Sequence, residues 1–370
     1  MERVRTRCVV QLAALLTNAL LKMSANKKID HKRIAERMGL IVIPVDDLTI
    51  ERMPIDPDAE PDRRFDYCDL AGGVSGRRLR QIENLAIPPA WQNVRVAPQP
   101  KAHLQAVGVD GQGRTQYIYH EIWPKVRDEV KAARLLNFGK ALPVIREHVA
   151  RDMELPLTKR RAVVATAIRL IDDQLMRVGG EQYARNGTRG ASTLTNSNAR
   201  VRRNGVEIKY RGKGGKQLSV SLRDKALRKK VQQLKKRPGR RLFSYPSRSR
   251  QPTSIRAGHI NEYLAKASGL PITAKDFRTY AASSIALKFL CEPDAQSCSS
   301  PVSDVSKLVA KKLRNTPTVA RTSYIHPYIL NAFEQDNLDR KLIQGRLRNG
   351  LSKAETALMR FLENHTLPAV

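Results

Sequence analysis

The sequence has few cysteines for its length. Its 370 residues include four, Cys8, Cys68, Cys291 and Cys298. They form no CxxC pair, and no histidine stands near them at the spacing of zinc ligands. The sequence therefore predicts neither a disulfide framework nor a bound metal, and its cysteine usage is typical of a reducing compartment.

Long apolar runs and acidic residues are also scarce. No run of 18 or more apolar residues is present, so the sequence predicts no transmembrane helix. Asp and Glu number 35 against 67 Lys and Arg, which gives a formal charge of +32. Such an excess favours a polyanionic partner, first nucleic acid, because binding phosphates releases counterions, and second an acidic membrane surface. A basic surface that only aids solubility is the remaining interpretation.

The chain length predicts two or three domains. Residues 1–55 are interpreted as an N-terminal extension of unknown role. Its start, MERVRTRCVVQLAALLTNALLKM, is basic and partly apolar but lacks a clear signal-cleavage site. This pattern favours an appended amphipathic helix, or a true start at Met23, over a targeting segment. The stretch PIDPDAEPD at the end of the extension is typical of a linker.

The remaining sequence changes character near residue 120. Residues 56–119 consist of strand-like runs and turns, and a glycine-rich turn between LQAVGV and QYIYH predicts a β-hairpin. Residues 120–370 are mainly helical in pattern. The predicted fold class is therefore α+β, with a small N-terminal β domain and a larger, mainly helical domain. Helices are expected over 256–268, 274–290, 303–313 and 317–324, and a last helix begins at the capping box Ser352-x-x-Glu355.

Two patterns in the helical half carry candidate side chains. An apolar helix face runs from Val164 to Val178, and Gly179 is expected to end this helix with Arg177 in its last turn. Alternating apolar residues over 206–222 predict a second β-hairpin, whose glycine-rich tip carries Lys213 and Lys216.

The stretch around this hairpin is the most basic of the chain. Residues 200–241 hold 17 Lys or Arg against two acidic residues, Glu207 and Asp224. A basic stretch of this density is expected to lie on phosphates.

A short helix near the C-terminus carries a tyrosine. Thr316 and Pro317 are typical of an N-cap and a first helical position, and they place Tyr324 in the second turn. Asn315 stands just before the start of this helix.

Taken singly, these side chains have ordinary interpretations. Arg177 would complement a helix dipole, and Lys213 would be a solvated turn residue. Arg278, in AKDFRTYAAS, would pair with a carboxylate, and Tyr324 would be a buried ring with a satisfied hydroxyl.

Taken together, they predict phosphoryl transfer to a tyrosine without a metal or other cofactor. A phenol oxygen becomes a usable nucleophile when it loses its proton, normally near pH 10. Guanidinium groups stabilise the negative charge on the non-bridging phosphate oxygens. A lysine on a hairpin tip supplies the proton that the departing 5′ oxygen needs.

The same segments resemble those of the type IB DNA topoisomerases, in their poxvirus-like and bacterial branch, over about residues 64–370. ENLAIPPAWQNVRVAP and QYIYHEIW resemble the small β domain of that family. RLIDDQLMRVGGEQYA, IKYRGKGGKQ, KDFRTYAAS and NTPTVARTSYI resemble its catalytic segments, in the same order. The resemblance implies that the catalytic residues are Arg177, Lys213, Arg278, Asn315 and Tyr324. Lys213 is preferred over Lys216 because the family has Gly-Lys at the hairpin tip.

The resemblance also implies a mode of action. Two domains would close around duplex DNA as a clamp, and Tyr324 would become linked to a 3′ phosphate. The free strand would rotate and rejoin, which relaxes supercoils without ATP. The protein would act as a monomer in the bacterial cytoplasm, at the nucleoid and not at a membrane. The implied DNA contacts are Gln116, Tyr117, Tyr119, Tyr183 and Lys275.

One residue departs from the common pattern of the family. Most members have a histidine nine residues before the tyrosine, whereas Asn315 resembles the bacterial branch. An asparagine keeps a neutral N–H donor for a phosphate oxygen but does not titrate.

Two other interpretations remain open. A tyrosine recombinase shares this chemistry, but it normally has a histidine where Lys275 stands and a helical N-terminal domain. A non-catalytic basic DNA-binding protein would explain the charge but not the combination of arginines, lysine and tyrosine. Charge alone does not separate DNA from RNA as the substrate.

Overall fold

The computed structural model describes residues 29–55, 65–69, 72–203, 205–247, 251–293, 295 and 298–366. They form two compact units, one of residues 29–131 and a larger one that begins at Ala132. The amphipathic helix expected at the start of the chain lies outside the described residues, as does most of the expected linker.

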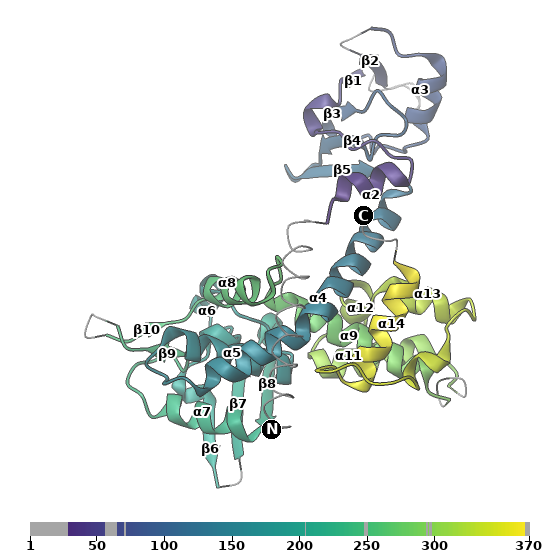
Figure 1. Cartoon of the computed structure of the whole chain (residues 1–370). Helices are drawn as coiled ribbons and strands as arrows, with labels where there is room; N and C mark the ends of the chain where they lie inside the picture. The colour runs from purple at the N-terminus through teal and green to yellow at the C-terminus, as the bar shows by residue number, and fades with distance from the viewer. Residues whose placement is uncertain are drawn as a thin grey trace. The chain divides into compact units, whose positions relative to one another are not determined.

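The unit of residues 29–131 is built on a five-stranded antiparallel sheet with the strand order β2-β1-β3-β4-β5 (Figure 1). β4 and β5 form the hairpin that the glycine-rich turn predicted, which confirms that expectation. The strands are β1 (Ile50–Pro54), β2 (Phe65–Asp69), β3 (Gln92–Val96), β4 (Leu104–Val109) and β5 (Thr115–Tyr119).

The sequence suggested a domain boundary after residue 55, but the structure places residues 29–131 in one unit. β1 pairs with β2 on one side and with β3 on the other, so residues 50–54 form an inner strand of this sheet. The short helix α2 (His31–Arg37), capped by the Asp30 carboxylate, belongs to the same unit. A break after residue 55 therefore does not separate an extension from the β domain.

Helix α3 (Gly76–Glu83) packs on this sheet. Its Ile82 lies in one buried cluster with Ile50, Val94 and Val96 of the inner strands. Burial of such side chains stabilises a fold by about 1.5–3 kcal/mol each. The sheet of this small unit is thus held by a core of its own.

The larger unit is mainly helical, which together with the small sheets confirms the α+β class. The four helices expected between residues 256 and 324 match their expected bounds within two residues, and Ser352 and Glu355 form the expected capping box. The helices are α4 (Trp123–Glu154, whose first nine residues belong to the smaller unit), α5 (Arg160–Gln174), α6 (Glu181–Arg185), α7 (Lys225–Lys235), α8 (Ala257–Ser268), α9 (Ala274–Cys291), α11 (Pro301–Leu313), α12 (Pro317–Ser323), α13 (Pro327–Glu334) and α14 (Lys353–His365).

A three-stranded antiparallel sheet, in the order β6-β7-β8, stands against α7 (Figure 1). β7 and β8 are the predicted second hairpin, and a single 3-10 turn, η4 (Lys213–Gly215), forms its tip. The strands are β6 (Ala199–Arg202), β7 (Gly205–Arg211) and β8 (Gln217–Leu222), and a separate two-stranded ribbon consists of β9 (Ser244–Tyr245) and β10 (Thr253–Ser254).

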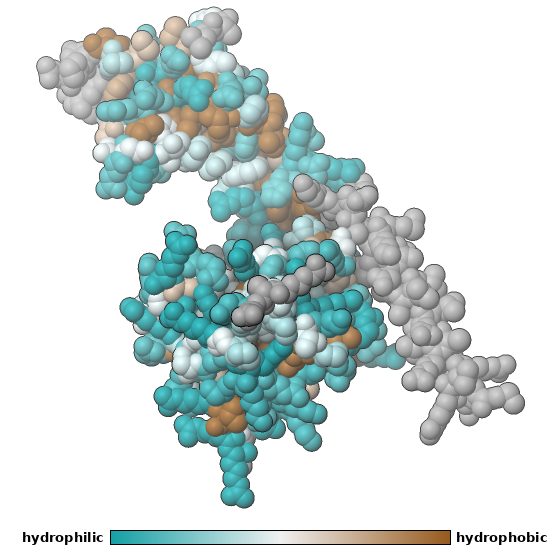
Figure 2. Space-filling view, turned by 90° about the vertical axis from the view of Figure 1, so that its left-hand side faces the viewer, coloured by the Kyte–Doolittle hydropathy of each residue, from teal (hydrophilic) through white to brown (hydrophobic). Residues whose placement is uncertain are grey.

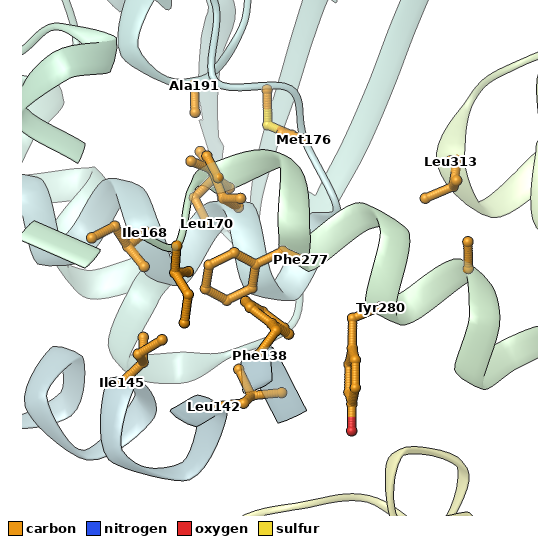
Figure 3. Close-up of a cluster of buried hydrophobic side chains, with 14 of the residues drawn as sticks. Phe138, Leu142, Ile145, Ile168, Leu170, Met176, Ala191, Phe277, Tyr280 and Leu313 are labelled. Atoms are coloured by element: carbon orange, nitrogen blue, oxygen red, sulfur yellow. The ribbon is translucent and has the colours of Figure 1, made fainter. Parts of the chain in front are cut away.

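Aromatic rings from α4 and α9 lie in the core of the larger unit (Figure 3). The ring centroid of Phe138 is 5.0 Å from that of Phe277 and 5.2 Å from that of Tyr280. Edge-on and tilted pairs of this kind add about 0.5–1.5 kcal/mol beyond area burial. Helix α9, which carries Arg278, is therefore firmly anchored.

In the view of Figure 2, hydrophilic residues cover most of the larger unit and apolar residues form small patches. Within the described part of the chain, no helix has the length and apolar character needed to cross a bilayer.

Candidate active site

Tyr324 lies at the end of helix α12. The Thr316 side chain accepts a hydrogen bond from Val319 N, and Pro317 is the first helical residue, as the sequence predicted. The helix ends at Ser323, one residue earlier than expected, and Tyr324 is its C-cap, with φ −126° and ψ −42°. The ring is half-buried and packs against the core of the larger unit.

The backbone around Tyr324 is fixed by a serine of α9. The Ser283 hydroxyl donates to the carbonyl oxygen of Tyr324 at 3.3 Å and accepts from His326 N at 3.1 Å. A single side chain thus holds the two peptide units that directly follow the tyrosine, on either side of Ile325.

Arg278 comes from the same helix and is 3% exposed. Its Nη1 donates to the carbonyl of Leu175 and its Nη2 to that of Leu313 at 3.0 Å, while its Cζ lies 5.0 Å from the ring centroid of Tyr324. These acceptors are neutral, so the expected alternative, a carboxylate partner, is wrong for Arg278. The positive charge therefore remains available at the tyrosine, and burial lowers the pKa of this guanidinium.

Arg177 does not lie in a helix, contrary to the sequence prediction. Helix α5 ends at Gln174, and Leu175 follows in the left-handed region at φ 50° and ψ 36°. The chain then runs irregularly, and Arg177 Nη2 donates to Asn315 Oδ1.

Gly179, which was expected to end this helix, instead lies in close backbone contact with Gly190. A Cβ on Gly179, which has φ +85°, would lie 2.9 Å from Gly190 Cα, and one on Gly190 would lie 2.6 Å from Arg177 O. The Ala191 N–H donates to Arg177 O at 2.9 Å across this contact. Because neither residue has a Cβ, the backbone at Gly190 can lie directly against the segment that carries Arg177 and Gly179.

Asn315 follows α11, and its N–H donates to Ala310 O at 2.9 Å. Its Oδ1 accepts from Arg177, whereas its Nδ2 is buried without a hydrogen-bond partner, as is Arg278 Nε. A buried unpaired donor costs about 1–3 kcal/mol. Two unpaired donors on two different segments next to one tyrosine are suited to bind an anion.

The Tyr324 phenol has a lowered pKa. Burial alone would raise it, but the nearby guanidinium groups of Arg278 and Arg177, with a smaller contribution from the Asn315 amide, lower it further than burial raises it. This surrounding favours the phenolate, the nucleophilic form.

The structure brings Arg177, Arg278, Asn315 and Tyr324 together but does not place Lys213 against them. Lys213 is exposed at the tip of the hairpin and forms no hydrogen bond or ion pair with the described residues. Lys216 is exposed as well, so the structure does not choose between the two lysines.

The part of β7 next to this tip does reach the site. Tyr210 of β7 is 6% exposed, and burial raises the pKa of its phenol against the opposing charges of Arg314, Arg278 and Arg177. The Arg189 N–H also donates to Arg211 O at 2.7 Å, which ties β7 to the turn beside Arg177.

The predicted DNA contacts of the smaller unit fall on two faces of β5. Tyr117 and Tyr119 are exposed on one face with stacked rings 6.2 Å apart. Gln116 lies on the opposite face, where its Nε2 donates to Asp110 Oδ2 at 2.8 Å. In the larger unit Tyr183 and Lys275 are both exposed, on α6 and on α9.

Sequence reasoning missed Ser283 and Arg314. Arg314 ends α11 in the left-handed region, where glycine or asparagine is usual, so its sequence context carried no signal. For Ser283, a small polar residue five positions after Arg278 does not by itself indicate a contact with the tyrosine. Tyr210 belongs to the apolar alternation that predicted the hairpin, and its side chain is buried.

Two family profiles match the chain. Residues 122–342 match the family described as "Eukaryotic DNA topoisomerase I, catalytic core", and residues 64–110 match "Bacterial DNA topoisomerase IB, N-terminal domain". The chain is also 29% identical over 282 residues to a protein named "DNA topoisomerase 1B" from Acanthamoeba polyphaga mimivirus. That alignment covers 73% of this chain and 84% of the viral protein.

Proposed function

The chain belongs to the type IB DNA topoisomerase family, and from this premise we propose that Tyr324 is the nucleophile with which it cuts one strand of duplex DNA. The observation that carries this assignment is the convergence of Arg177, Arg278 and Asn315 on one half-buried tyrosine whose pKa is lowered. The rival interpretations, a tyrosine recombinase and a non-catalytic DNA-binding protein, have no support in the matched families.

The first step forms a bond between Tyr324 Oη and the phosphorus of a phosphodiester. The bond from phosphorus to the 5′ oxygen of the next nucleotide breaks, so the product is a 3′-phosphotyrosyl link and a 5′-hydroxyl end. The phenol gives up its proton before or during attack, and Arg278 favours this loss.

The charge of the transition state falls on the two non-bridging oxygens. Arg177 and Arg278 are proposed to donate to these oxygens, and Asn315 adds its unpaired Nδ2. Donors that are fixed before reaction need no rearrangement when the charge develops, and each is typically worth about 10²–10³ in rate.

The leaving 5′ oxygen needs a proton, which we assign to Lys213. Its support is its place on the hairpin tip, beyond a strand whose Tyr210 faces the same arginines. Gly214 and Gly215 at this tip have φ near +76° and +79°, a conformation that lets the chain turn tightly beside the lysine.

Strand rotation and reversal of the first step complete the cycle. The phosphotyrosyl link keeps the energy of the phosphodiester, so the 5′ hydroxyl attacks it and reseals the strand without ATP. We propose that Tyr117, Tyr119, Tyr183 and Lys275 contact the duplex, since all four are exposed. Gln116 would have to leave Asp110 to do so. We also propose a monomeric, cytoplasmic protein, which light scattering and cell fractionation would test.

Plasmid relaxation tests this proposal. Wild-type protein is expected to relax both negatively and positively supercoiled plasmid in EDTA without ATP, and Tyr324→Phe is expected to relax neither. Tyr328→Phe, four residues further along, is the matched control and should retain activity. Relaxation that survives in Tyr324→Phe would overturn the assignment.

A further inference from the structure

Both partners of the contact between Arg177 and Asn315 follow a residue in the left-handed region. Leu175, at φ 50°, stands two residues before Arg177, and Arg314, at φ 57° and ψ 47°, stands directly before Asn315. In the described part of the larger unit, Asp336 is the one further non-glycine residue with positive φ. Such a conformation costs about 1–2 kcal/mol and persists where surrounding contacts enforce it.

The contacts of the Arg314 side chain show what holds the left-handed backbone conformation of this residue in place. Arg314 Nη1 donates to the carbonyl oxygen of Gln174 at 2.7 Å, and Nη2 lies 3.5 Å from Gln174 Oε1. Gln174 is the last residue of α5, so its carbonyl has no partner within the helix. Arg278 donates to the next carbonyl, that of Leu175. Two guanidinium groups from two other segments thus cap the end of α5.

Two links in opposite directions therefore join the same pair of segments. Arg314 reaches from the end of α11 to Gln174, and Arg177 reaches back from the end of α5 to Asn315. The first link fixes the place from which the Arg177 chain leaves α5. The second sets where its guanidinium meets the Asn315 amide.

Arg314 also keeps its charge near the site. It forms no ion pair with a carboxylate among the residues that the structure describes, and its hydrogen-bond acceptors are neutral. Of the three arginines whose charges act on Tyr210, it acts most strongly.

We propose that Arg314 is a positioning residue that holds Arg177 against Asn315 during strand cleavage. The inference rests on the proposed catalytic roles of Arg177 and Asn315. Arg314 itself acts through them and not on the phosphate. A displacement of about 1 Å in such a site costs up to ~10²-fold in rate.

Three variants test the role of the side chain. Arg314→Gly removes the guanidinium but keeps the left-handed backbone accessible, and Arg314→Lys keeps a charge and one donor. Lys311→Gln, on an exposed position of the same helix, is the control for loss of one charge. The readouts are the single-turnover cleavage rate on a duplex that traps the covalent product, the affinity for uncleaved duplex, and the thermal unfolding midpoint.

Arg314→Gly is expected to slow cleavage by about 10–100-fold, with duplex affinity changed less than threefold. Arg314→Lys should recover cleavage to within about tenfold of wild type, and Lys311→Gln should cleave as wild type does. A normal cleavage rate in Arg314→Gly would overturn the proposal. So would an equal loss of cleavage and duplex affinity, because that result would make Arg314 a direct DNA contact.

A double-mutant cycle separates positioning from an independent effect. If Arg314 acts through Arg177, adding Arg314→Gly to Arg177→Ala should change the residual cleavage rate less than threefold. Full additivity of the two losses would overturn the proposal. Tyr324→Phe, run in parallel, distinguishes the two levels of inference: an adduct in that variant contradicts the proposed function itself, whereas its absence together with a normal Arg314→Gly contradicts only the role of Arg314.

Discussion

The guanidinium carbon of Arg278 lies 5.0 Å from the ring centroid of Tyr324, and neither side chain is paired with a carboxylate among the described residues. A buried charge that is left unpaired beside a phenol favours loss of the phenol proton. The same guanidinium is in place to meet the charge of a phosphate. This pairing links the activation of the nucleophile to the binding of its target.

The pH dependence of cleavage should report this pairing. Because the phenol pKa is lowered in the native protein, the single-turnover rate should rise with pH and level off below the normal tyrosine pKa of about 10. Arg278→Gln removes the strongest of the influences that lower this pKa, so the midpoint should move to higher pH. The maximal rate should fall by about 10²–10³-fold.

Lys288→Gln is the control for this experiment. It lies on the same helix at an exposed position, where its Nζ is 3.7 Å from Glu292. Its midpoint should equal that of wild type. A midpoint that stays unchanged in Arg278→Gln would show that this arginine does not set the phenol pKa.

The unpaired Nδ2 of Asn315 can be tested separately from its contact with Arg177. Asn315→Asp keeps an oxygen for Arg177 but replaces the donor by a negative charge, so cleavage should fall by ~10²-fold or more. Asn315→Ala should lose most activity, whereas Asn315→His, which restores a donor, should keep substantial relaxation activity. Wild-type cleavage by the Ala variant would deny this residue a catalytic role.

The adjacent serines Ser283 and Ser284 allow a matched pair of alanine variants. Ser283→Ala removes the hydroxyl that bridges Tyr324 O and His326 N and should cost about 1–3 kcal/mol of stability together with a slower cleavage step. Ser284→Ala removes a hydroxyl that bonds only within its own helix, to Ala281 O at 3.0 Å. Chemical denaturation and single-turnover cleavage should separate the two variants. Equal cleavage rates would mean that Ser283 does not position the tyrosine.

The choice between Lys213 and Lys216 has a chemical test. If Lys213 protonates the leaving oxygen, Lys213→Ala should slow cleavage of normal DNA by about 10²–10⁴-fold. A substrate with sulfur at the 5′ bridging position has a leaving group that needs no proton, so it should restore most of the rate. Lys216→Ala should show neither effect, and rescue of Lys216→Ala instead would reassign the role.

Regular elements were the most predictable part of this protein. Apolar periodicity and capping residues set α9, α12 and the hairpin β7–β8 within two residues. The end of α5 was predicted wrongly because the apolar spacing continues through Leu175 and Val178 after the helix has ended. There the guanidiniums of Arg314 and Arg278 cap the chain, and such long-range contacts leave no trace in a local pattern.

The site residues were predictable only as a set. Arg177, Arg278, Asn315 and Tyr324 each had an ordinary local interpretation, and their order along the chain pointed to one reaction. The geometry now adds contacts that spacing does not contain, such as Arg177 on Asn315. Lys213 remains a prediction because no contact of its side chain places it at the site.

Identification of the residue that becomes linked to DNA is the most direct test of the account. Wild-type protein is trapped on a duplex whose cleaved 3′ segment carries a label, digested with trypsin, and the labelled peptide is sequenced. The account predicts a single adduct at Tyr324 through the 3′ phosphate. An adduct at another residue, such as Tyr183 or Tyr328, or a link to the 5′ end, would contradict it.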